Sequence, residues 1–344
     1  MTEDRSKLVR NIAARRLGGP PGTFESPLTA LASPAWRGVD ADIWLARRGT
    51  SAEIYKHYHD DSSAYVDVAA ALSSATIAGD QGVGPSVLET MPEDGAVVME
   101  YLGEGWRAGG LHDCVNSNFR SRVIAAKKAL HTGPRFLRDG DIFSEINRLN
   151  RACVSSYARL PLNIRAYHAF AEQARQAITA LGAEKVPCHR DGNTANLMIG
   201  PDGQVKLIDF DLSANADPFE DAGCYLLEFF ECEPEARQGF EEWFGRFHEG
   251  HFQRAMIYGI LDDLRWGLIG ALMAATSPRR SLEFAKYASW RFMRFNELAQ
   301  RSHAADGFAA RRRGKQWMNR SNTKSSPPSR PFRAGIMRRS SGAR

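Results

Sequence analysis

One segment, VPCHRDGNTANLMIGPDGQVKLIDFDLS (residues 186–213), restricts the fold of this chain more than any other stretch. Two apolar runs in it, NLMI and QVKLIDF, flank Gly200-Pro201-Asp202-Gly203, and this combination predicts a β-hairpin. The hairpin would bring Asn196, at the start of its first strand, close to Asp209 at the end of its second. We therefore expect Asp191, Asn196 and Asp209 to converge on one point.

These three side chains have the chemistry that phosphoryl transfer from a nucleotide requires. A carboxylate such as Asp191 can orient an acceptor hydroxyl and take its proton. The amide oxygen of Asn196 and the carboxylate of Asp209 are hard oxygen ligands of the kind that Mg²⁺ prefers. The small residues between Asp191 and Asn196 only have to turn the chain, so the loop would hold two oxygen groups at a fixed separation.

The pattern H-x-D-x-x-x-x-N, followed by a hairpin and Ile-Asp-Phe, resembles the catalytic and metal-binding loops of the protein-kinase-like fold. Other stretches look like its small-molecule branch, the aminoglycoside phosphotransferase and choline/ethanolamine kinase superfamily. The resemblance covers roughly residues 30–300. The stretches are GVGPSVLETMPEDGAVVMEYLGE, AAKKALH, ADPFEDAGCYLLEFF and RWGLIGALMAATSPRRSLEFAKYASWRFMRF.

The resemblance and the pattern along the chain predict an α+β, bilobal fold with a small β-rich N-terminal lobe and a larger, mostly helical C-terminal lobe. The runs DIWLARRG and AEIYKHY predict a second hairpin, and YVDVAAALSSATIAGD predicts a helix. We expect an N-terminal extension (residues 1–24), a nucleotide-binding lobe (25–101) and a helical lobe with the catalytic and metal loops (102–302). Residues 303–344, rich in Arg, Ser and Pro, are expected to be a basic disordered tail.

A protein substrate is not expected. Asp211 stands where a protein kinase has the glycine of its Asp-Phe-Gly motif, and no Ala-Pro-Glu motif follows. The helical segment with Asp221 begins about a dozen residues later, which leaves no room for an activation loop. The acceptor is therefore expected to be a small molecule.

The resemblance implies that ATP binds in the N-terminal lobe. Lys56 is the expected phosphate-binding cation, and Asp67 is the only acid available in the following helix to orient it. A loop with a single glycine, Gly38, would cover the phosphates. His189 is expected to bond backbone groups near the metal loop rather than act as a base. The adenine would lie against a hinge formed by Met99, Glu100 and Tyr101.

The acceptor site is expected on the helical side, where acidic residues gather. Residues 220–242 contain eight acids and one basic residue, and of these acids Asp221 and Glu228 are the candidate substrate contacts. Clustered carboxylates attract cations, although most of these acids can also be the hydrated faces of helices. Trp266 and Tyr287 match positions where choline kinases enclose a quaternary ammonium group. Ile269 replaces a further tryptophan of that cage, and packing is the alternative role of both aromatic residues.

Charge is distributed unevenly along the chain. Of 45 Lys and Arg and 40 Asp and Glu, residues 301–344 hold 12 basic residues and one acid, which leaves 33 and 39 for residues 1–300. Nucleic-acid binding would therefore rest on the tail alone and is not favoured. No membrane span or signal region is recognisable, and five scattered cysteines are typical of free thiols, so we expect a cytoplasmic protein.

These observations favour a kinase that uses ATP and Mg²⁺ to phosphorylate a hydroxyl of a small cationic molecule, with a choline- or ethanolamine-like amino alcohol preferred. Three alternatives remain open. The acceptor can be an aminoglycoside, a sugar or a lipopolysaccharide-core sugar. The poor glycine loop also fits a catalytically weak pseudokinase, a binding module that would bind nucleotide weakly or not at all. The basic tail fits a nucleic-acid-associated factor, and the sequence does not indicate an oligomeric state.

Overall fold

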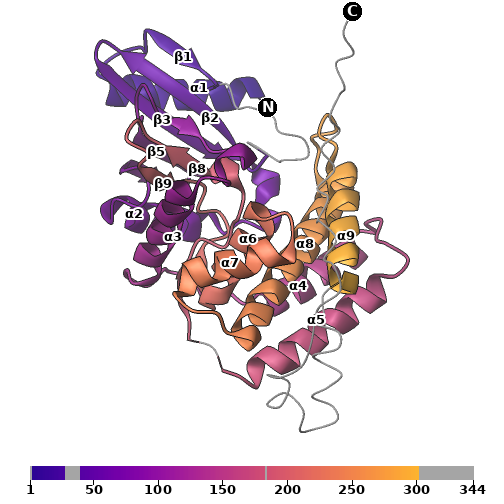
Figure 1. The fold of residues 1–344 in the computed structure, drawn as a ribbon. Coiled ribbons are helices and arrows are strands. Elements are labelled where there is room, and N and C mark those ends of the chain that lie inside the picture. Colours follow the sequence, from indigo (N-terminus) through magenta and orange to yellow (C-terminus); the bar gives the residue numbers. More distant parts are fainter. Residues whose placement is uncertain (1, 28–38, 183, 302–344) are drawn as a thin grey trace, which may run out of the picture.

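The computed structural model describes residues 2–27, 39–182 and 184–301 of the 344-residue chain. In this part the chain forms two lobes, a sheet-containing lobe from the N-terminal third and a mostly helical lobe from the remainder (Figure 1). The predicted α+β, bilobal architecture is confirmed.

Five antiparallel strands form the sheet of the N-terminal lobe, in the order β1-β2-β3-β5-β4. The predicted hairpin joins β2 to β3, and its turn contains Gly49 with a φ of +59°, which glycine adopts without strain. The predicted helix is α2 (Val68–Asp80), which lies beside β4. The strands are β1 (Thr23–Glu25), β2 (Ala41–Arg48), β3 (Ser51–Tyr58), β4 (Val87–Met91) and β5 (Ala96–Glu100).

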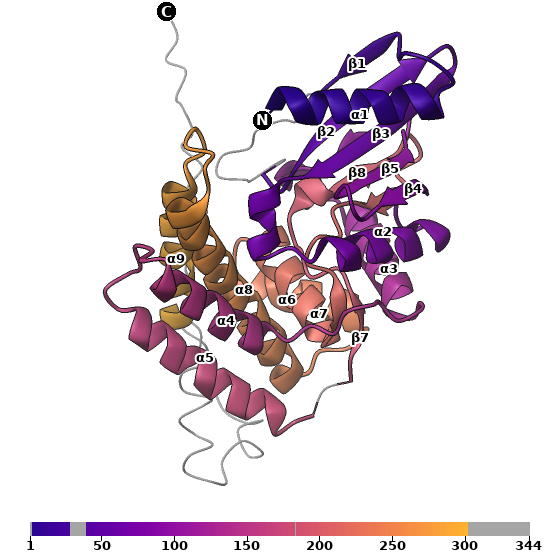
Figure 2. The ribbon, with the colours of Figure 1, turned by 180° about the vertical axis from the view of Figure 1, so that it is seen from behind.

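The first residues of the chain belong to this lobe and are not a separate extension. They form α1 (Thr2–Arg16), which lies across the sheet (Figure 2). Val9 and Ile12 of this helix pack with Tyr55 and Val98 of the sheet in one buried cluster. The boundary expected after residue 24 would also divide β1, so the lobe begins at α1.

Helices dominate the C-terminal lobe, and two small sheets carry its functional loops. One sheet has the order β6-β8-β9 and the other pairs β10 with β7. The strands are β6 (Arg107–Ala108), β7 (Val186–Cys188), β8 (Leu197–Ile199), β9 (Val205–Leu207) and β10 (Ala214–Ala216). The helices are α3 (Ser117–His131), α4 (Ile142–Ser155), α5 (Ile164–Thr179), α6 (Pro218–Phe229), α7 (Glu233–Phe244), α8 (Glu249–Thr276) and α9 (Phe284–Arg301).

The long helix α8 is the central element of this lobe. It is buried along most of its 28 residues and packs against α4, α6 and α9. Its approach to α6 depends on two glycines, because a Cβ on Gly223 would lie 2.1 Å from the carbonyl oxygen of Ala255, and one on Gly259 would lie 2.6 Å from the carbonyl oxygen of Gly223. Two helices can come this close only where side chains are absent, so α6 is fixed in place beside the catalytic loop.

All five cysteines are free thiols, as predicted, and four of them are buried. Within the described ranges, no helix has both the length and the hydropathy needed to cross a bilayer. The basic tail at residues 303–344 lies outside the described residues, so its disorder stays a prediction.

Candidate active site

The predicted catalytic loop follows β7 and places Asp191 next to Asn196. Asp191 Oδ1 accepts a hydrogen bond from the backbone N–H of Asn193 at 2.7 Å, and its Oδ2 accepts one from Asn196 Nδ2 at 3.0 Å. The predicted hairpin of β8 and β9 follows directly, and the backbone N–H of Ile208 donates to the carbonyl oxygen of Asn196 at 2.9 Å. Asp209 comes next in the chain, so the structure brings Asp191, Asn196 and Asp209 into one region.

His189 joins the predicted catalytic loop to the predicted metal-binding loop around Asp209. Its Nε2 lies 2.9 Å from the carbonyl oxygen of Ile208, and its Nδ1 lies 3.2 Å from that of Asp191. Both ring nitrogens thus face backbone carbonyl oxygens, and the residue is 1% exposed. This is the structural role expected for His189, and it leaves no nitrogen to act as a base.

Asp221 is a structural residue, which corrects its expected contact with substrate. The residue is 0% exposed, and its carboxylate accepts bonds from the backbone N–H groups of His189 and Arg190 at 3.0 and 2.8 Å. It also contacts Lys127 Nζ at 2.9 Å and His131 Nε2 at 2.8 Å. Burial opposes ionisation, but Lys127 and His131 outweigh it and hold the pKa of Asp221 well below its usual range. A substrate could reach this carboxylate only by breaking the catalytic loop.

Lys56 points from β3 toward the metal-binding loop, and its acidic partners lie there. Its Nζ is 2.6 Å from Oδ1 of Asp209 and 2.6 Å from Oδ1 of Asp211. Asp67 does not orient Lys56, contrary to expectation, because it is the N-cap of α2 and accepts from the backbone N–H of Ala70. Burial disfavours the charged lysine, but the two carboxylates raise the pKa of Lys56 well above its usual range. Asp211 therefore has the role that was expected for Asp67, which is to pair with Lys56 and orient it.

The same loop offers a set of oxygen ligands suited to a divalent cation. Carboxylate oxygens of Asp40, Asp209 and Asp211 lie within 4.8 Å of one another, and Oδ2 of Asp211 is buried without a hydrogen-bond partner. Among the described residues the amide oxygen of Asn196 also makes no hydrogen bond, because only its nitrogen is engaged. Burial, followed by the charge of Asp209, raises the pKa of Asp40 to about 6. One lysine cannot neutralise three carboxylates, so the residues present fit Mg²⁺.

Asp191, the expected proton acceptor, also has a raised pKa. Burial raises the pKa of Asp191 above its ordinary value, and the nearby charges of Asp209 and Asp262 act in the same direction. A carboxylate with a raised pKa holds a proton more firmly, which suits a group that receives one during a reaction.

The predicted hinge lies at the end of β5. Met99 pairs with Ile54 in the sheet, and the carboxylate of Glu100 accepts from Lys206 Nζ at 2.7 Å and from the backbone N–H of Ser86 at 2.8 Å. Lys206 belongs to β9, so this contact joins the hinge to the hairpin of the metal loop. The ring of Tyr101 stacks under the guanidinium of Arg47 at 4.5 Å. Gly38, expected over the phosphates, lies outside the described residues.

The two aromatic residues expected near the acceptor are buried and close together. Trp266 on α8 and Tyr287 on α9 have ring centroids 6.3 Å apart, and Arg291 lies against both rings. Glu228, on α6, is half-buried and accepts from the backbone N–H of Thr194 in the catalytic loop at 3.3 Å. Glu228 is therefore next to the loop, while Asp221 on the same helix is beneath it.

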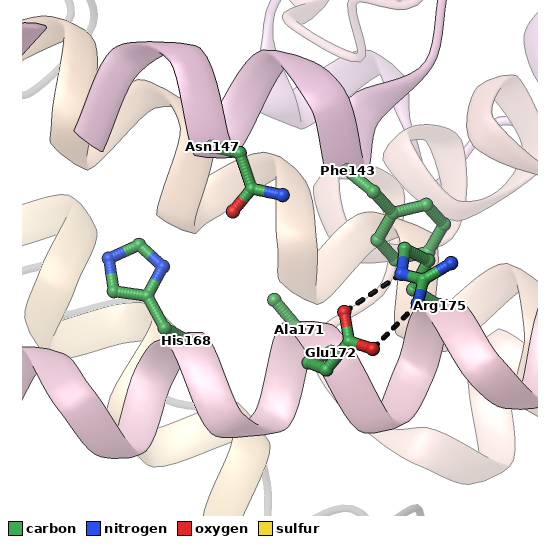
Figure 3. A pocket seen from close by; sticks show the side chains of 6 residues that line it. All are labelled: Phe143, Asn147, His168, Ala171, Glu172 and Arg175. Atoms are coloured by element: carbon green, nitrogen blue, oxygen red, sulfur yellow. Dashed lines mark hydrogen bonds and ion pairs between the residues drawn. The ribbon is translucent and has the colours of Figure 1, made fainter. Parts of the chain in front are cut away.

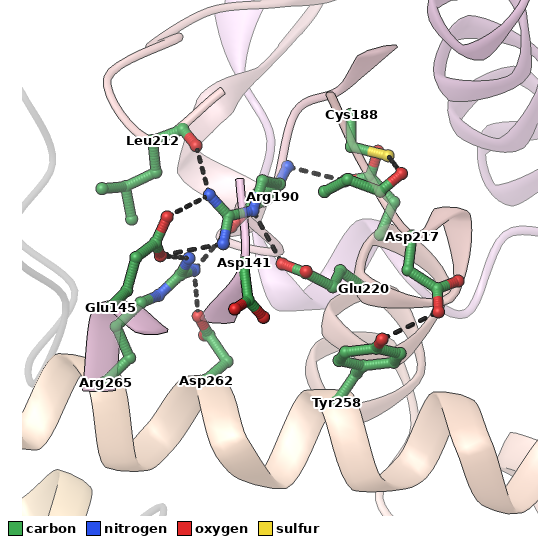
Figure 4. A network of polar contacts seen from close by, with 12 residues as sticks. Asp141, Glu145, Cys188, Arg190, Leu212, Asp217, Glu220, Tyr258, Asp262 and Arg265 are labelled. Atoms are coloured by element: carbon green, nitrogen blue, oxygen red, sulfur yellow. Dashed lines mark hydrogen bonds and ion pairs between the residues drawn. The ribbon is translucent and has the colours of Figure 1, made fainter. Parts of the chain in front are cut away.

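A buried ionic network holds the catalytic loop against the helices (Figure 4). Arg190, with a φ of +64°, bonds both carboxylate oxygens of Glu145 on α4 at 2.8 Å and Glu220 on α6 at 2.7 Å. Arg265 on α8 donates to the carbonyl oxygen of Arg190 at 3.0 Å and also contacts Asp262. Side chains from three helices thereby hold Arg190, the residue immediately before Asp191.

A shallow pocket between α4 and α5 is separate from this site (Figure 3). Figure 3 shows Glu172 and Arg175 of α5 paired at its rim, with Asn147 facing it from α4. It contains none of the residues that surround Asp191. The lining residues are Phe143, Asn147, His168, Ala171, Glu172 and Arg175.

Several site residues were missed from the sequence, and one pair of them carried a usable signal. Lys127 and His131 are spaced four apart in AAKKALH, which places them on one face of a helix, and both hold Asp221. The partners of Arg190, Glu145 on α4 and Glu220 on α6, come from elements far apart in the sequence, and no local pattern indicates those contacts.

Comparisons with known proteins agree with this fold. Residues 36–257 match the phosphotransferase enzyme family (APH), whereas no curated protein matches the chain. A choline/ethanolamine kinase family protein from Mesorhizobium loti has a similar structure, with 24% identity, a TM-score of 0.72 and coverage of 91% of this chain and 99% of that chain. Choline kinase LicA from Streptococcus pneumoniae gives 17% identity, a TM-score of 0.70 and coverage of 86% and 99%. A spectinomycin phosphotransferase, solved with ADP and spectinomycin, has 14% identity and a TM-score of 0.57. The match covers 86% of this chain and 98% of that chain.

Proposed function

Because the chain belongs to the phosphotransferase enzyme family, as its sequence indicated, we propose that it transfers the γ-phosphoryl group of ATP to a hydroxyl group of a small cationic molecule, with an amino alcohol as the preferred acceptor. One observation carries this proposal. Asp191, Asn196, Asp209 and Lys56 meet across the two lobes, with Asn196 Nδ2 3.0 Å from Asp191 and Lys56 Nζ 2.6 Å from Asp209.

Each residue has a separate task in this reaction. The acceptor oxygen forms a bond to the γ-phosphorus, the bond from that phosphorus to the β–γ bridging oxygen breaks, and ADP departs. Asp191 orients the acceptor hydroxyl and receives its proton. Lys56 binds phosphate oxygens, and Asn196 and Asp209 would hold Mg²⁺. When bound, that ion supplies positive charge next to the phosphates.

Negative charge on the acceptor side supports a cationic acceptor. Glu228 lies next to the catalytic loop, and the charges of Asp191 and Asp262 are close enough to influence one another. Carboxylates gathered around a site attract positively charged ligands and raise their local concentration. An amino alcohol meets both requirements, since it carries a hydroxyl and an ammonium group.

An aminoglycoside is the second candidate acceptor. It also combines hydroxyl and ammonium groups, and the same carboxylates would attract it. The spectinomycin phosphotransferase to which this chain is similar was solved with ADP and spectinomycin, which supports keeping this class in the experiment.

The test is ADP release from ATP and Mg²⁺ by the full-length protein. Choline, ethanolamine, a panel of aminoglycosides and simple sugars are offered separately, with the Asp191→Asn variant as the matched control. We expect an amino alcohol to stimulate ADP release by the wild type and not by the variant. If no acceptor stimulates release and ATP produces no thermal shift, the result favours the pseudokinase alternative over the kinase. A thermal shift without release would mean that the protein binds ATP and that its acceptor lies outside this panel.

A further inference from the structure

Three aromatic rings, those of Trp266, Tyr287 and Trp290, surround a cation that belongs to the chain itself. We refer to these three residues as the aromatic cluster. The central guanidinium carbon of Arg291 lies 5.9, 5.2 and 4.9 Å from their respective ring centroids. Such distances allow the ring faces to attract a positive charge. The aromatic cluster is thus a cation site, and Arg291 fills it.

Arg291 is also anchored by directed polar contacts. Its Nε donates to the hydroxyl of Tyr287 at 2.8 Å, and its Nη1 donates to Asp263 Oδ1 at 2.7 Å. The side chain of Asp263 is 1% exposed, and its other charged contact is Arg294, whose Nε lies 3.2 Å from Oδ2. A ligand that displaced Arg291 would leave this buried carboxylate short of one partner, which is strongly unfavourable unless the ligand can donate a replacement hydrogen bond.

The aromatic cluster lies next to the part of α8 that contacts the loop carrying Asp191, because Arg265, the residue before Trp266, donates to the carbonyl oxygen of Arg190 at 3.0 Å. Trp266 is one helical turn beyond Asp262 on α8, and α9 packs along α8 and brings Tyr287 alongside. Burial raises the pKa of Glu228, Arg294 and Arg291 lower it, and the charge of Asp191 raises it again. Contacts agree with this placement. Arg294, three residues beyond Arg291 on α9, donates to the carbonyl oxygen of Leu227 at 2.9 Å. The next residue, Glu228, accepts from the backbone N–H of Thr194 in the loop that carries Asp191, at 3.3 Å.

We propose that Arg291 determines the acceptor specificity of this site by occupying the aromatic cluster and so excluding quaternary ammonium alcohols. A quaternary ammonium has no N–H group, so ring faces are the contact that favours it most, and here Arg291 already covers them. An acceptor with N–H groups on its nitrogen can instead bind the carboxylate of Glu228 through charge-assisted hydrogen bonds. The inference rests on the proposed function, which supplies the acceptor, and it narrows that acceptor to amines with at least one N–H.

Ligand binding without nucleotide tests the inference. Tetramethylammonium and choline are titrated into the full-length wild type and the Arg291→Ala variant, and tryptophan fluorescence is followed with NaCl as the ionic-strength control. We expect no saturable change for the wild type. Arg291→Ala should bind both cations at least about tenfold more tightly, the scale of one desolvated cation–π contact. Guanidinium chloride should compete with them, because it restores the missing group.

Two further variants make the outcome decisive. Arg294→Ala removes a neighbouring arginine that contacts Trp290 and Asp263 but leaves Arg291 in place, so it should gain no binding. Arg291→Met keeps a long apolar stem and replaces Arg291→Ala if circular dichroism shows that the alanine variant does not fold. Saturable binding of tetramethylammonium by the wild type overturns the proposal, as does its absence in a folded Arg291 variant.

These outcomes are independent of the proposed function. Cation binding requires neither ATP nor turnover, so a gain of binding in Arg291→Ala supports the cation site even if no acceptor stimulates ADP release. Conversely, ADP release with ethanolamine supports the kinase even if the wild type binds tetramethylammonium.

Discussion

The side-chain nitrogen of Asn196 lies 3.0 Å from Oδ2 of Asp191, so the residue proposed to bind metal also positions the proposed proton acceptor. An amide has one donor end and one acceptor end. Here the donor end faces Asp191, and the oxygen is left for a cation. The spacing of five residues between Asp191 and Asn196 therefore links the two halves of the proposed chemistry through a single side chain.

Replacing Asp191 with asparagine should separate binding from turnover. The variant keeps the size of the side chain but can no longer accept a proton from the acceptor hydroxyl. We expect turnover to fall by roughly 10²-fold or more, the usual contribution of a positioned acid–base group, while ATP affinity is retained. Steady-state ADP release and a nucleotide titration measure the two quantities. Near-normal turnover would assign the proton acceptor to another residue.

Replacing Asp209 with alanine should abolish Mg²⁺-dependent nucleotide binding. The carboxylates of Asp209 and Asp211 both contact Lys56 Nζ, each at 2.6 Å. Burial opposes the ionisation of Asp209, but Lys56 holds its pKa below the usual value. Its loss removes both a metal ligand and a partner of Lys56. The measurement is the thermal shift produced by ATP with and without Mg²⁺. An unchanged, Mg²⁺-dependent shift in Asp209→Ala would exclude this residue as a ligand.

The partner of Lys56 can be identified by comparing two aspartates. Asp211→Asn weakens the contact to Lys56 Nζ, and we expect the KM for ATP to rise roughly tenfold, the scale of one charge-assisted hydrogen bond. Asp67→Ala removes only the N-cap of α2, so it should cost about 1 kcal/mol of stability and leave the KM unchanged. The reverse pattern would restore Asp67 as the residue that orients Lys56.

The local parts of the site were predictable because short spacings encode them. Asp191 and Asn196 belong to one loop, and the Gly-Pro-Asp-Gly turn determines where the following strand returns. The β2–β3 hairpin is equally local, and it is enough to direct Lys56 toward the metal loop. In both cases the functional side chains and the turn that positions them lie within one continuous stretch of sequence.

The remaining contacts depend on how distant elements pack. Asp67 was expected to pair with Lys56, although an aspartate just before an Ala-rich run is also a typical N-cap, and the structure shows that role. Asp221 was expected at the acceptor site because of its acidic neighbours, but α6 turns it inward beneath the catalytic loop. The guanidinium of Arg291 reaches Trp266 only because α9 packs along α8, and that crossing is not encoded in either helix alone.

Removing the charge of Glu145 should destabilise the protein severely. Its carboxylate binds Arg190 at 2.8 Å and Arg265 at 3.2 Å, and both arginine side chains are almost fully buried. Burial opposes its ionisation, yet Arg190 and Arg265 lower the pKa of Glu145 to about 2. Glu145→Gln would leave two buried guanidinium groups short of a counter-charge, a situation that typically costs about 3–5 kcal/mol.

Urea unfolding measures this loss, and Glu172→Gln is the matched control. Glu172 also pairs with an arginine, Arg175, but on the exposed surface of α5, so water replaces the interaction and little change is expected. Equal effects of the two substitutions would show that the buried network contributes no more than a surface pair.

Glu220 should make the stability of the protein depend on pH near neutrality. Burial raises its pKa to about 7, although Arg190 Nε is only 2.7 Å away, because Arg190 already shares its charge with Glu145. The folded state therefore holds a proton more firmly than the unfolded chain, in which a glutamate titrates near its ordinary pKa of about 4.3. The stability that protonated Glu220 contributes is therefore fully present below the pKa of the unfolded chain, and it is lost as the pH rises through the folded-state pKa of about 7.

The difference between wild type and Glu220→Gln isolates this titration, because glutamine carries no proton that can be lost. Between pH 5 and pH 8 the free energy of unfolding of the wild type should fall relative to that of the variant by about 1–3 kcal/mol. Glu283→Gln, which removes an exposed partner of Lys286, should follow the wild type at every pH. Parallel curves for wild type and Glu220→Gln would mean that Glu220 is ionised throughout this range. Arg190 would then form ion pairs with two charged carboxylates at once, those of Glu145 and Glu220. The catalytic loop would be held by both ion pairs rather than by the one to Glu145 alone.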